Sequence, residues 1–119
     1  MVKKWYTSGG MSAHLFYHDG GWWVDLFNDA KPSAALALSR EVFTTLGHVK
    51  DCVPDGEFAH NLGDNIYLKR SLFRSKWYTS VRMYYTSDDG SMQPGRQGIT
   101  VNDTAWGCLK TCIDNIGKH

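Results

Sequence analysis

Residues 92–101 read MQPGRQGITV, and this stretch decides how the C-terminal half of the chain folds. A Pro-Gly pair follows the polar turn at residues 88–90 and runs into alternating apolar positions, so we expect a sharp turn that leads into a strand. Asn102 comes next and has the character of a helix N-cap. Apolar residues then follow at helical spacing, namely Trp106, Leu109, Ile113 and Ile116. The predicted order is strand, turn, strand, helix.

The same region carries a family signature. Residues 84–113, YYTSDDGSMQPGRQGITVNDTAWGCLKTCI, resemble the C-terminal domain of the positive cofactor four family of transcriptional coactivators. That family has an acidic turn, then Met-x-Pro-Gly-Arg-x-Gly-Ile, then a polar cap and a helix with an early Trp. The resemblance continues upstream without a gap to about Leu62 and covers roughly half of the chain. It implies a single-stranded-DNA-binding unit of a kind that works as a dimer.

The N-terminal half shows a similar order of elements. Residues 11–27 predict a hairpin around Gly20-Gly21, residues 35–38 predict a strand, and Ser39 caps a predicted helix. When this strand and helix are placed over their C-terminal counterparts, Ser39 falls on Asn102 with a constant shift of 63 residues. The two hairpins align with a smaller shift, near 54. This pattern indicates an internal repeat.

We therefore predict an α+β protein built from two repeats of a curved antiparallel β-sheet, each a hairpin plus a further strand followed by a C-terminal helix. The two repeats would form a pseudo-dimer within one chain. Residues 1–56 would be a degenerate strand-strand-strand-helix repeat, and residues 57–119 the coactivator-like, single-stranded-DNA-binding repeat. The alternative is that residues 1–56 are an unrelated extension.

The charge distribution is more informative than the net charge. The 119 residues carry a formal net charge of only +1, but residues 66–87 contain five basic residues and no acidic one. A local basic strip of this kind suits salt-dependent binding of a polyanion. Three cysteines, with Cys108 and Cys112 one helical turn apart, favour reduced thiols. We expect an intracellular protein, nuclear in a eukaryote and cytoplasmic in a bacterium or phage, with no membrane span.

Alternation along the predicted strand at residues 76–84 separates two faces. One face is apolar enough to pack on a helix, whereas the other interleaves cations with aromatic rings, as a single-stranded nucleic acid requires. Arg70 falls on the apolar side of the preceding strand and is kept as a candidate that emerges at a bend. The candidate nucleic-acid-binding residues are Lys69, Arg70, Phe73, Arg74, Lys76, Tyr78, Arg82, Tyr85 and Arg96.

The resemblance implies roles for several of these residues. Phe73 matches a base-stacking Phe of the family, Tyr85 stands where the family has a stacking Trp, and the remaining matches are basic positions, namely Arg74, Lys76, Arg82 and Arg96. Four positions that are usually or commonly basic in the family are not basic here: Asp64, Ser71, Gln93 and Gln97. We expect weaker binding and a shallower salt dependence as a result.

The predicted function is sequence-tolerant binding of single-stranded DNA in transcription or in replication and repair. RNA binding and a protein-interaction adaptor that has lost strong nucleic-acid binding are the alternatives. Base stacking by the aromatic residues of the N-terminal repeat, namely Phe16, Tyr17, Trp22 and Trp23, is an alternative, but core packing is the favoured use of most of them. We expect no catalytic residues, no metal and no cofactor. The partners would be single-stranded DNA and the transcription machinery, and the protein would be a monomeric pseudo-dimer or a homodimer.

Overall fold

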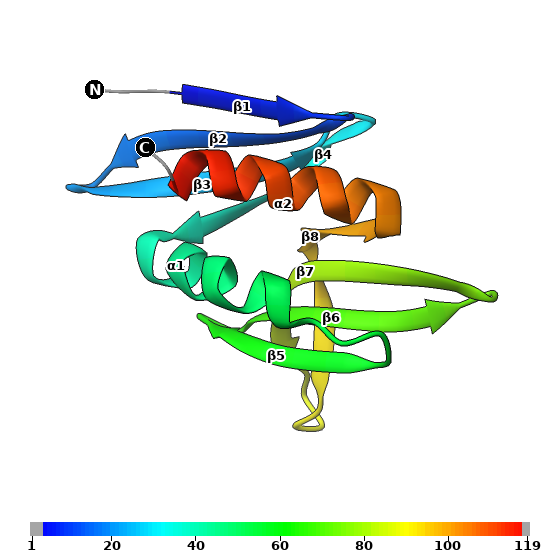
Figure 1. Cartoon of the computed structure of the whole chain (residues 1–119). Helices are drawn as coiled ribbons and strands as arrows, with labels where there is room; N and C mark the ends of the chain where they lie inside the picture. Colours follow the sequence, from blue (N-terminus) through cyan, green and yellow to red (C-terminus); the bar gives the residue numbers. More distant parts are fainter. Residues whose placement is uncertain (1–3, 118–119) are drawn as a thin grey trace.

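Alternating apolar residues form two four-stranded antiparallel sheets in the computed structural model, which describes residues 4–117 (Figure 1). The first sheet and its helices consist of β1 (Lys4–Ser8), β2 (Met11–His18), β3 (Gly21–Asn28), β4 (Lys31–Ser39), α1 (Arg40–Val49) and the short 3-10 helix η1 (Lys50–Cys52). The second consists of β5 (Phe58–Gly63), β6 (Ile66–Phe73), β7 (Lys76–Thr86), β8 (Met92–Asn102) and α2 (Asp103–Gly117). The two-repeat α+β pseudo-dimer is confirmed.

Each sheet has one strand more than the sequence predicted. The additional strands, β1 and β5, open their sheets and pair only with the following strand. Their residues are mostly exposed, so they lack the alternation by which the other strands were found. Both helix caps were predicted correctly, because the Ser39 side chain accepts the Val42 N–H and the Asn102 side chain accepts the Ala105 N–H.

The Pro94-Gly95 pair does not form the expected turn. It lies inside β8, and the chain instead reverses at residues 87–91, where the Ser87 N–H donates to the carbonyl oxygen of Ser91 at 2.8 Å. Pairing between β7 and β8 is irregular from Arg82 to Tyr84, next to this pair. Because β8 is an edge strand of its sheet, a proline there is compatible with the sheet hydrogen bonds.

Strand pairing shows which residues of the two repeats are equivalent. The first hairpin turns at Asp19-Gly20, one residue before the predicted site, and the second turns at Arg74-Ser75. The hairpins are therefore related by a shift of 55 rather than 54. The last strand and helix keep the predicted shift of 63, since Ser39 pairs with Trp23 as Asn102 pairs with Tyr78.

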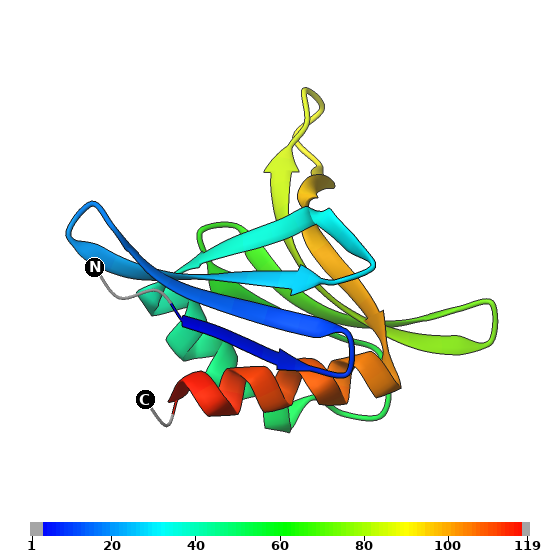
Figure 2. The ribbon, with the colours of Figure 1, turned by 90° about the horizontal axis from the view of Figure 1, so that it is seen from above.

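The two helices lie between the sheets and fill one shared hydrophobic core (Figures 1 and 2). Helix α2 contacts β1 and β2 of the first sheet as well as β7 and β8, whereas α1 contacts β3, β4 and β5. Each sheet therefore packs one face on the helices and turns its other face outward. Neither helix in the described part of the chain is long and apolar enough to cross a membrane.

A buried lysine links the two repeats at the edge of this core. The Lys50 ammonium lies 2.7 Å from a carboxylate oxygen of Asp51 and 2.7 Å from one of Asp114 in α2, and its side chain is only 4% exposed. Burial by itself lowers the pKa of Lys50, but the hydrogen bonds to Asp114 and Asp51 outweigh it and raise that pKa. The charge is thus paired at the point where α1 ends.

Candidate nucleic-acid interface

The outward side of the second sheet brings cations and aromatic rings together. Thr79 and Val81 of β7 are buried against the helices, so the alternate residues of β7 point outward. Antiparallel pairing places Lys69 opposite Ser80 and Tyr67 opposite Arg82. We call this surface the basic face, and it comprises Tyr67, Lys69, Phe73, Lys76, Tyr78, Arg82 and Tyr84.

Lys69 and two tyrosines form the centre of the basic face. The Lys69 ammonium lies 4.6 Å from the centroid of the Tyr84 ring, and the Tyr67 and Tyr84 rings meet edge to face at 5.2 Å. Neither tyrosine was among the predicted binding residues. Alternation in β7 does place Tyr84 with the outward residues, but the family resemblance directed attention to its neighbour Tyr85.

The turn between β6 and β7 carries the most exposed ring of the basic face. Phe73 is 60% exposed, its ring lies 6.5 Å from that of Tyr78, and the Arg74 guanidinium is 5.2 Å from the Phe73 ring centroid. Arg74 and Ser75 form the turn with φ angles of 52° and 65°. Phe73 thus stands in water beside Arg74 and Lys76, as the sequence indicated.

Arg82 is held in place by the irregular part of β8. Its guanidinium donates to the carbonyl oxygen of Gly95 at 3.0 Å, to that of Arg96 at 3.4 Å and to the Thr100 hydroxyl at 3.2 Å. Gly98 lies directly opposite Arg82, and a Cβ there would lie 2.8 Å from the Arg82 Cα. The Pro-Gly-Arg-x-Gly segment therefore supplies two of the three acceptors for Arg82 and the room for its side chain.

Gly98→Ala is expected to lower the free energy of unfolding by about 1–3 kcal/mol, because the new methyl group overlaps the Arg82 backbone. Gly107→Ala is the matched control. Gly107 lies in α2 with no atom near its missing Cβ, so alanine there is expected to raise stability by about 0.5–1 kcal/mol. Urea unfolding measures both, and equal effects of the two substitutions would rule out a steric role for Gly98.

Arg70 does not join the basic face. Its guanidinium donates to the Asp103 carboxylate at the start of α2 at 2.7 Å and lies 5.0 Å from the Trp77 ring centroid, on the helix side of the sheet. Its side chain is only 11% exposed. The hydrogen bond from Arg70 lowers the pKa of Asp103 and is also the main cause of the raised pKa of Arg70. β6 pairs with β7 without irregularity through Arg70, so the predicted bend is absent; we correct this assignment and regard Arg70 as structural.

Arg70→Met is expected to leave the affinity for oligo-dT within about twofold of the parent protein, because the lost charge is not on the basic face. Stability should fall by about 0.5–1.5 kcal/mol, since Asp103 is exposed and the ion pair is partly screened. Lys69→Met, at the neighbouring position on the opposite face, should instead lower the affinity roughly 3–10-fold. Fluorescence anisotropy with both variants separates the faces, and a larger loss with Arg70→Met would contradict the assignment.

Tyr85 and Arg96 lie toward the far end of the β7–β8 hairpin, which projects from the body of the protein (Figure 2). Tyr85 is 55% exposed and pairs with Gln93, on the side of β7 opposite to Tyr84. Arg96 is exposed beside the carbonyl groups that hold Arg82. Both side chains are accessible, but they flank the basic face and are not part of it.

The aromatic residues of the N-terminal repeat divide between two faces. Trp22 packs edge to face on Phe43 of α1 with ring centroids 5.9 Å apart, and Tyr17 pairs with Trp22 on the same side of the sheet. Phe16 and Trp23 pair with each other and point outward. Core packing therefore describes the environment of Trp22 but not that of Phe16 or Trp23. Within residues 4–117, no group of three or more His, Cys, Asp or Glu side chains is placed to hold a metal ion.

Comparison with known proteins finds a family match in the second repeat. Residues 60–112, from β5 into α2, match the model of the family described as Transcriptional Coactivator p15 (PC4). The chain is also similar to a solved structure described as "The crystal structure of MoSub1-DNA complex reveals a novel DNA binding mode", with 23% sequence identity over 56% of this chain and 83% of that one and a TM-score of 0.46. The matched residues lie within the second repeat, in the part of the chain whose sequence resembles this family.

Proposed function

We propose that this protein binds single-stranded DNA on the basic face and acts in transcription. The observation that carries the proposal is the interleaving of three outward cations with four outward rings on one sheet surface, namely Lys69, Lys76 and Arg82 with Tyr67, Phe73, Tyr78 and Tyr84. The family match supports DNA binding and a coactivator role. A role in transcription implies an intracellular location.

Each kind of side chain has a separate task in this mechanism. Lys69, Lys76 and Arg82 attract the phosphates, and the guanidinium of Arg82 is already oriented by β8, so less of its conformational freedom is lost on binding. Phe73 and Tyr84 offer ring faces to bases, which only an unpaired strand exposes. Single strands should therefore be preferred to duplex DNA. We keep Tyr85 and Arg96 in the proposal as flanking contacts on the projecting hairpin.

The backbone of the β6–β7 turn supports a functional use of its side chains. The two-residue turns at 9–10, 19–20 and 64–65 place Gly, Asp or Asn in the left-handed region, where these residues are common, and the turn at 29–30 has no positive φ. Among the turns within residues 4–117, only this one places an Arg and a Ser there, at φ angles of 52° and 65°. Non-glycine residues cost roughly 1–2 kcal/mol in that conformation. A turn that retains Arg74 at this cost is consistent with selection for its charge.

The depleted charge sets an upper limit on the salt dependence. The basic face and the residues that flank it contribute five cations, namely Lys69, Arg74, Lys76, Arg82 and Arg96. Each phosphate contact on a single strand contributes roughly 0.7 to the slope of log affinity against log salt, so the slope should not exceed about 3.5 in magnitude.

Fluorescence anisotropy with labelled oligonucleotides at two salt concentrations tests the proposal. Oligo-dT should bind more tightly than a duplex of the same length, and its affinity should fall as salt is raised. Oligo-dU compared with oligo-rU isolates the 2′-hydroxyl, and tighter binding of oligo-rU would replace DNA by RNA as the ligand. Equal affinity for single strand and duplex, or an affinity independent of salt, would refute the proposal.

A further inference from the structure

The outward side of the first sheet differs in chemistry from the basic face at equivalent positions. The two hairpins are related by a shift of 55 residues. Residues of β6 and β7 therefore have equivalents in β2 and β3. In this equivalence Lys69 becomes His14, Arg74 becomes Asp19, Lys76 becomes Gly21, Ser80 becomes Asp25 and Arg82 becomes Phe27. The outward side of the first sheet thus lacks the cations of the basic face and carries rings and carboxylates among the equivalent positions. Phosphates would meet repulsion there rather than attraction.

The rings of the first sheet form a ladder across its outward side. Trp5 stacks on His14 with centroids 4.1 Å apart and planes 5° from parallel, and it also lies 5.6 Å from Phe27. His14 in turn lies 5.3 Å from Phe16, which pairs with Trp23. Trp5 is 59% exposed. We call this surface the acidic aromatic face, and it comprises Trp5, His14, Phe16, Trp23, Asp25 and Phe27.

Asp25 lies in the middle of this face with little to neutralise its charge. It follows Trp23 and precedes Phe27 on the same side of β3, opposite His14 of β2 and Ala37 of β4. Among the described residues, its carboxylate has no hydrogen-bond or ion-pair partner. Burial raises the pKa of Asp25, and the nearby His14 only partly opposes this. The enclosed Nε2 of His14 also lacks a partner within the described residues.

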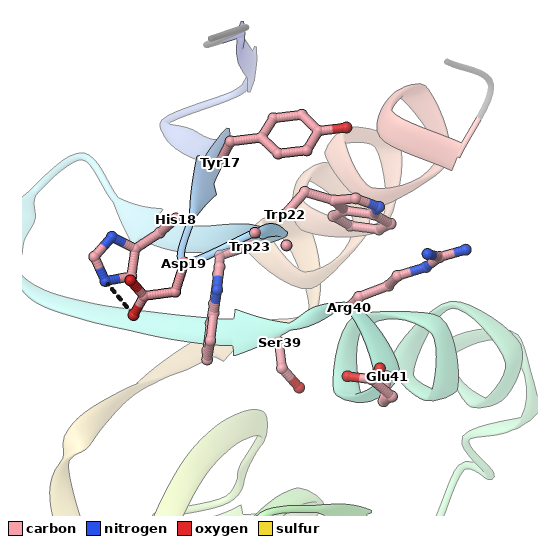
Figure 3. Close-up of a pocket in the computed structure, with 10 residues that line it drawn as sticks. Tyr17, His18, Asp19, Trp22, Trp23, Ser39, Arg40 and Glu41 are labelled. Carbon is pink, nitrogen blue, oxygen red and sulfur yellow. Dashed lines mark ion pairs between the residues drawn. The ribbon is translucent and has the colours of Figure 1, made fainter.

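A pocket of about 500 Å³ continues the face past Trp23, between the β2–β3 turn and the start of α1 (Figure 3). Its lining residues include Glu41 and Asp19, and the Asp19 carboxylate lies 3.2 Å from the Nε2 of His18. Figure 3 shows Trp23 on the same side of β3 as Ser39, whereas Trp22 lies on the other side, where the Arg40 guanidinium is 5.8 Å from the centroid of its ring. Trp23 therefore lies between Asp25, two residues further along β3, and the pocket that it lines.

We propose that the acidic aromatic face is a docking surface for a cationic peptide segment, with a lysine or arginine side chain over Trp23 and in contact with the Asp25 carboxylate. Aromatic faces attract lysine and arginine, most strongly where water is excluded. An arginine or lysine would also give Asp25 the charge-assisted hydrogen bond that it lacks. Glu41, which lines the adjoining pocket, would attract a second cation of the same segment. This partner is distinct from the nucleic acid proposed for the basic face.

Isothermal titration calorimetry with a blocked peptide of alternating arginine and glycine tests this inference on the full chain. The peptide should bind with an affinity that falls as salt is raised, and a peptide of alternating glutamate and glycine should not bind. Asp25→Asn should weaken peptide binding roughly tenfold or more while leaving oligo-dT binding unchanged. Lys69→Met should do the reverse. Thermal melts of both variants check that the fold is retained.

Three outcomes would overturn the inference. The first is no binding of the arginine peptide to the parent protein. The second is binding that Asp25→Asn leaves unchanged, which would place the peptide elsewhere. The third is a loss of oligo-dT affinity in Asp25→Asn equal to that in Lys69→Met, which would make the first sheet part of the nucleic-acid surface. Because the peptide and oligo-dT titrations are independent, failure of one proposal leaves the other open to its own test.

Discussion

Replacing Arg74 and Lys76 together by Glu is expected to weaken oligo-dT binding roughly 100-fold at low salt, because two attractive charges become repulsive at the tip of the basic face. The slope of log affinity against log salt should decrease in magnitude by about 1.4, at roughly 0.7 for each lost phosphate contact. Both residues are exposed, so the fold should not change. Anisotropy titrations over a range of salt concentrations measure both quantities.

A matched control separates local from overall charge. The double substitution Arg40→Glu and Lys110→Glu makes the same change in net charge on α1 and α2, away from the basic face. It should cost far less affinity than the change at Arg74 and Lys76. If the two double variants lose affinity equally, binding depends on net charge and not on the proposed surface. An adaptor that has lost nucleic-acid binding would show no oligo-dT affinity to lose.

Phe73→Ala is expected to weaken oligo-dT binding by about 5–150-fold, since stacking of one base on an aromatic ring contributes roughly 1–3 kcal/mol. Leu72→Ala is a close control. Leu72 is the neighbouring residue and is 51% exposed compared with 60% for Phe73, but it points to the opposite side of β6. Its removal should change affinity by less than about twofold.

This pair of variants distinguishes a contact on one side of the sheet from a general effect of apolar side chains near the turn. Equal losses in Phe73→Ala and Leu72→Ala would mean that the tip acts as a general hydrophobic contact. No loss in either would remove the tip from the interface. Thermal unfolding of both variants should show little change, because both side chains are largely in water.

Local signals predicted those parts of the fold that local chemistry determines. The caps Ser39 and Asn102 were predicted because a short polar side chain just before an apolar helical stripe is typical of a helix N-cap. The inward face of β7 was predicted because Thr79 and Val81 alternate with Tyr78, Ser80 and Arg82. Both residues are buried in the structure. The edge strands β1 and β5 were missed, since a strand that is exposed along most of its length carries no alternation.

The sequence predicted only part of the proposed binding surface, because the rest depends on pairing between distant residues. Arg70 was assigned to the surface because its partner Asp103 is 33 residues away and nothing local to β6 indicates that contact. Tyr67 and Tyr84 were missed because their proximity to each other and to Lys69 depends on the β6–β7 register. Conversely, the tip residues Phe73 and Lys76 were identified from their local sequence alone.

The division of the chain between residues 56 and 57 stays a prediction. The order of sheets and helices repeats across this point, but α2 packs on β1 and β2 of the first sheet, and buried residues of both repeats form one cluster. We therefore expect neither half to be stable when expressed alone. The difference between the two outward faces would then be specialisation within a single folded unit.

Chemical-shift mapping by NMR with oligo-dT and isotopically labelled protein tests the central claim most directly. The aromatic signals of Phe73, Tyr78 and Tyr84 should shift most, together with the side chain of Lys69, while those of Trp5 and Trp23 on the first sheet stay unchanged. Shifts concentrated on Trp5 and Trp23, with the basic face unaffected, would contradict the proposal that the second sheet holds the unpaired strand.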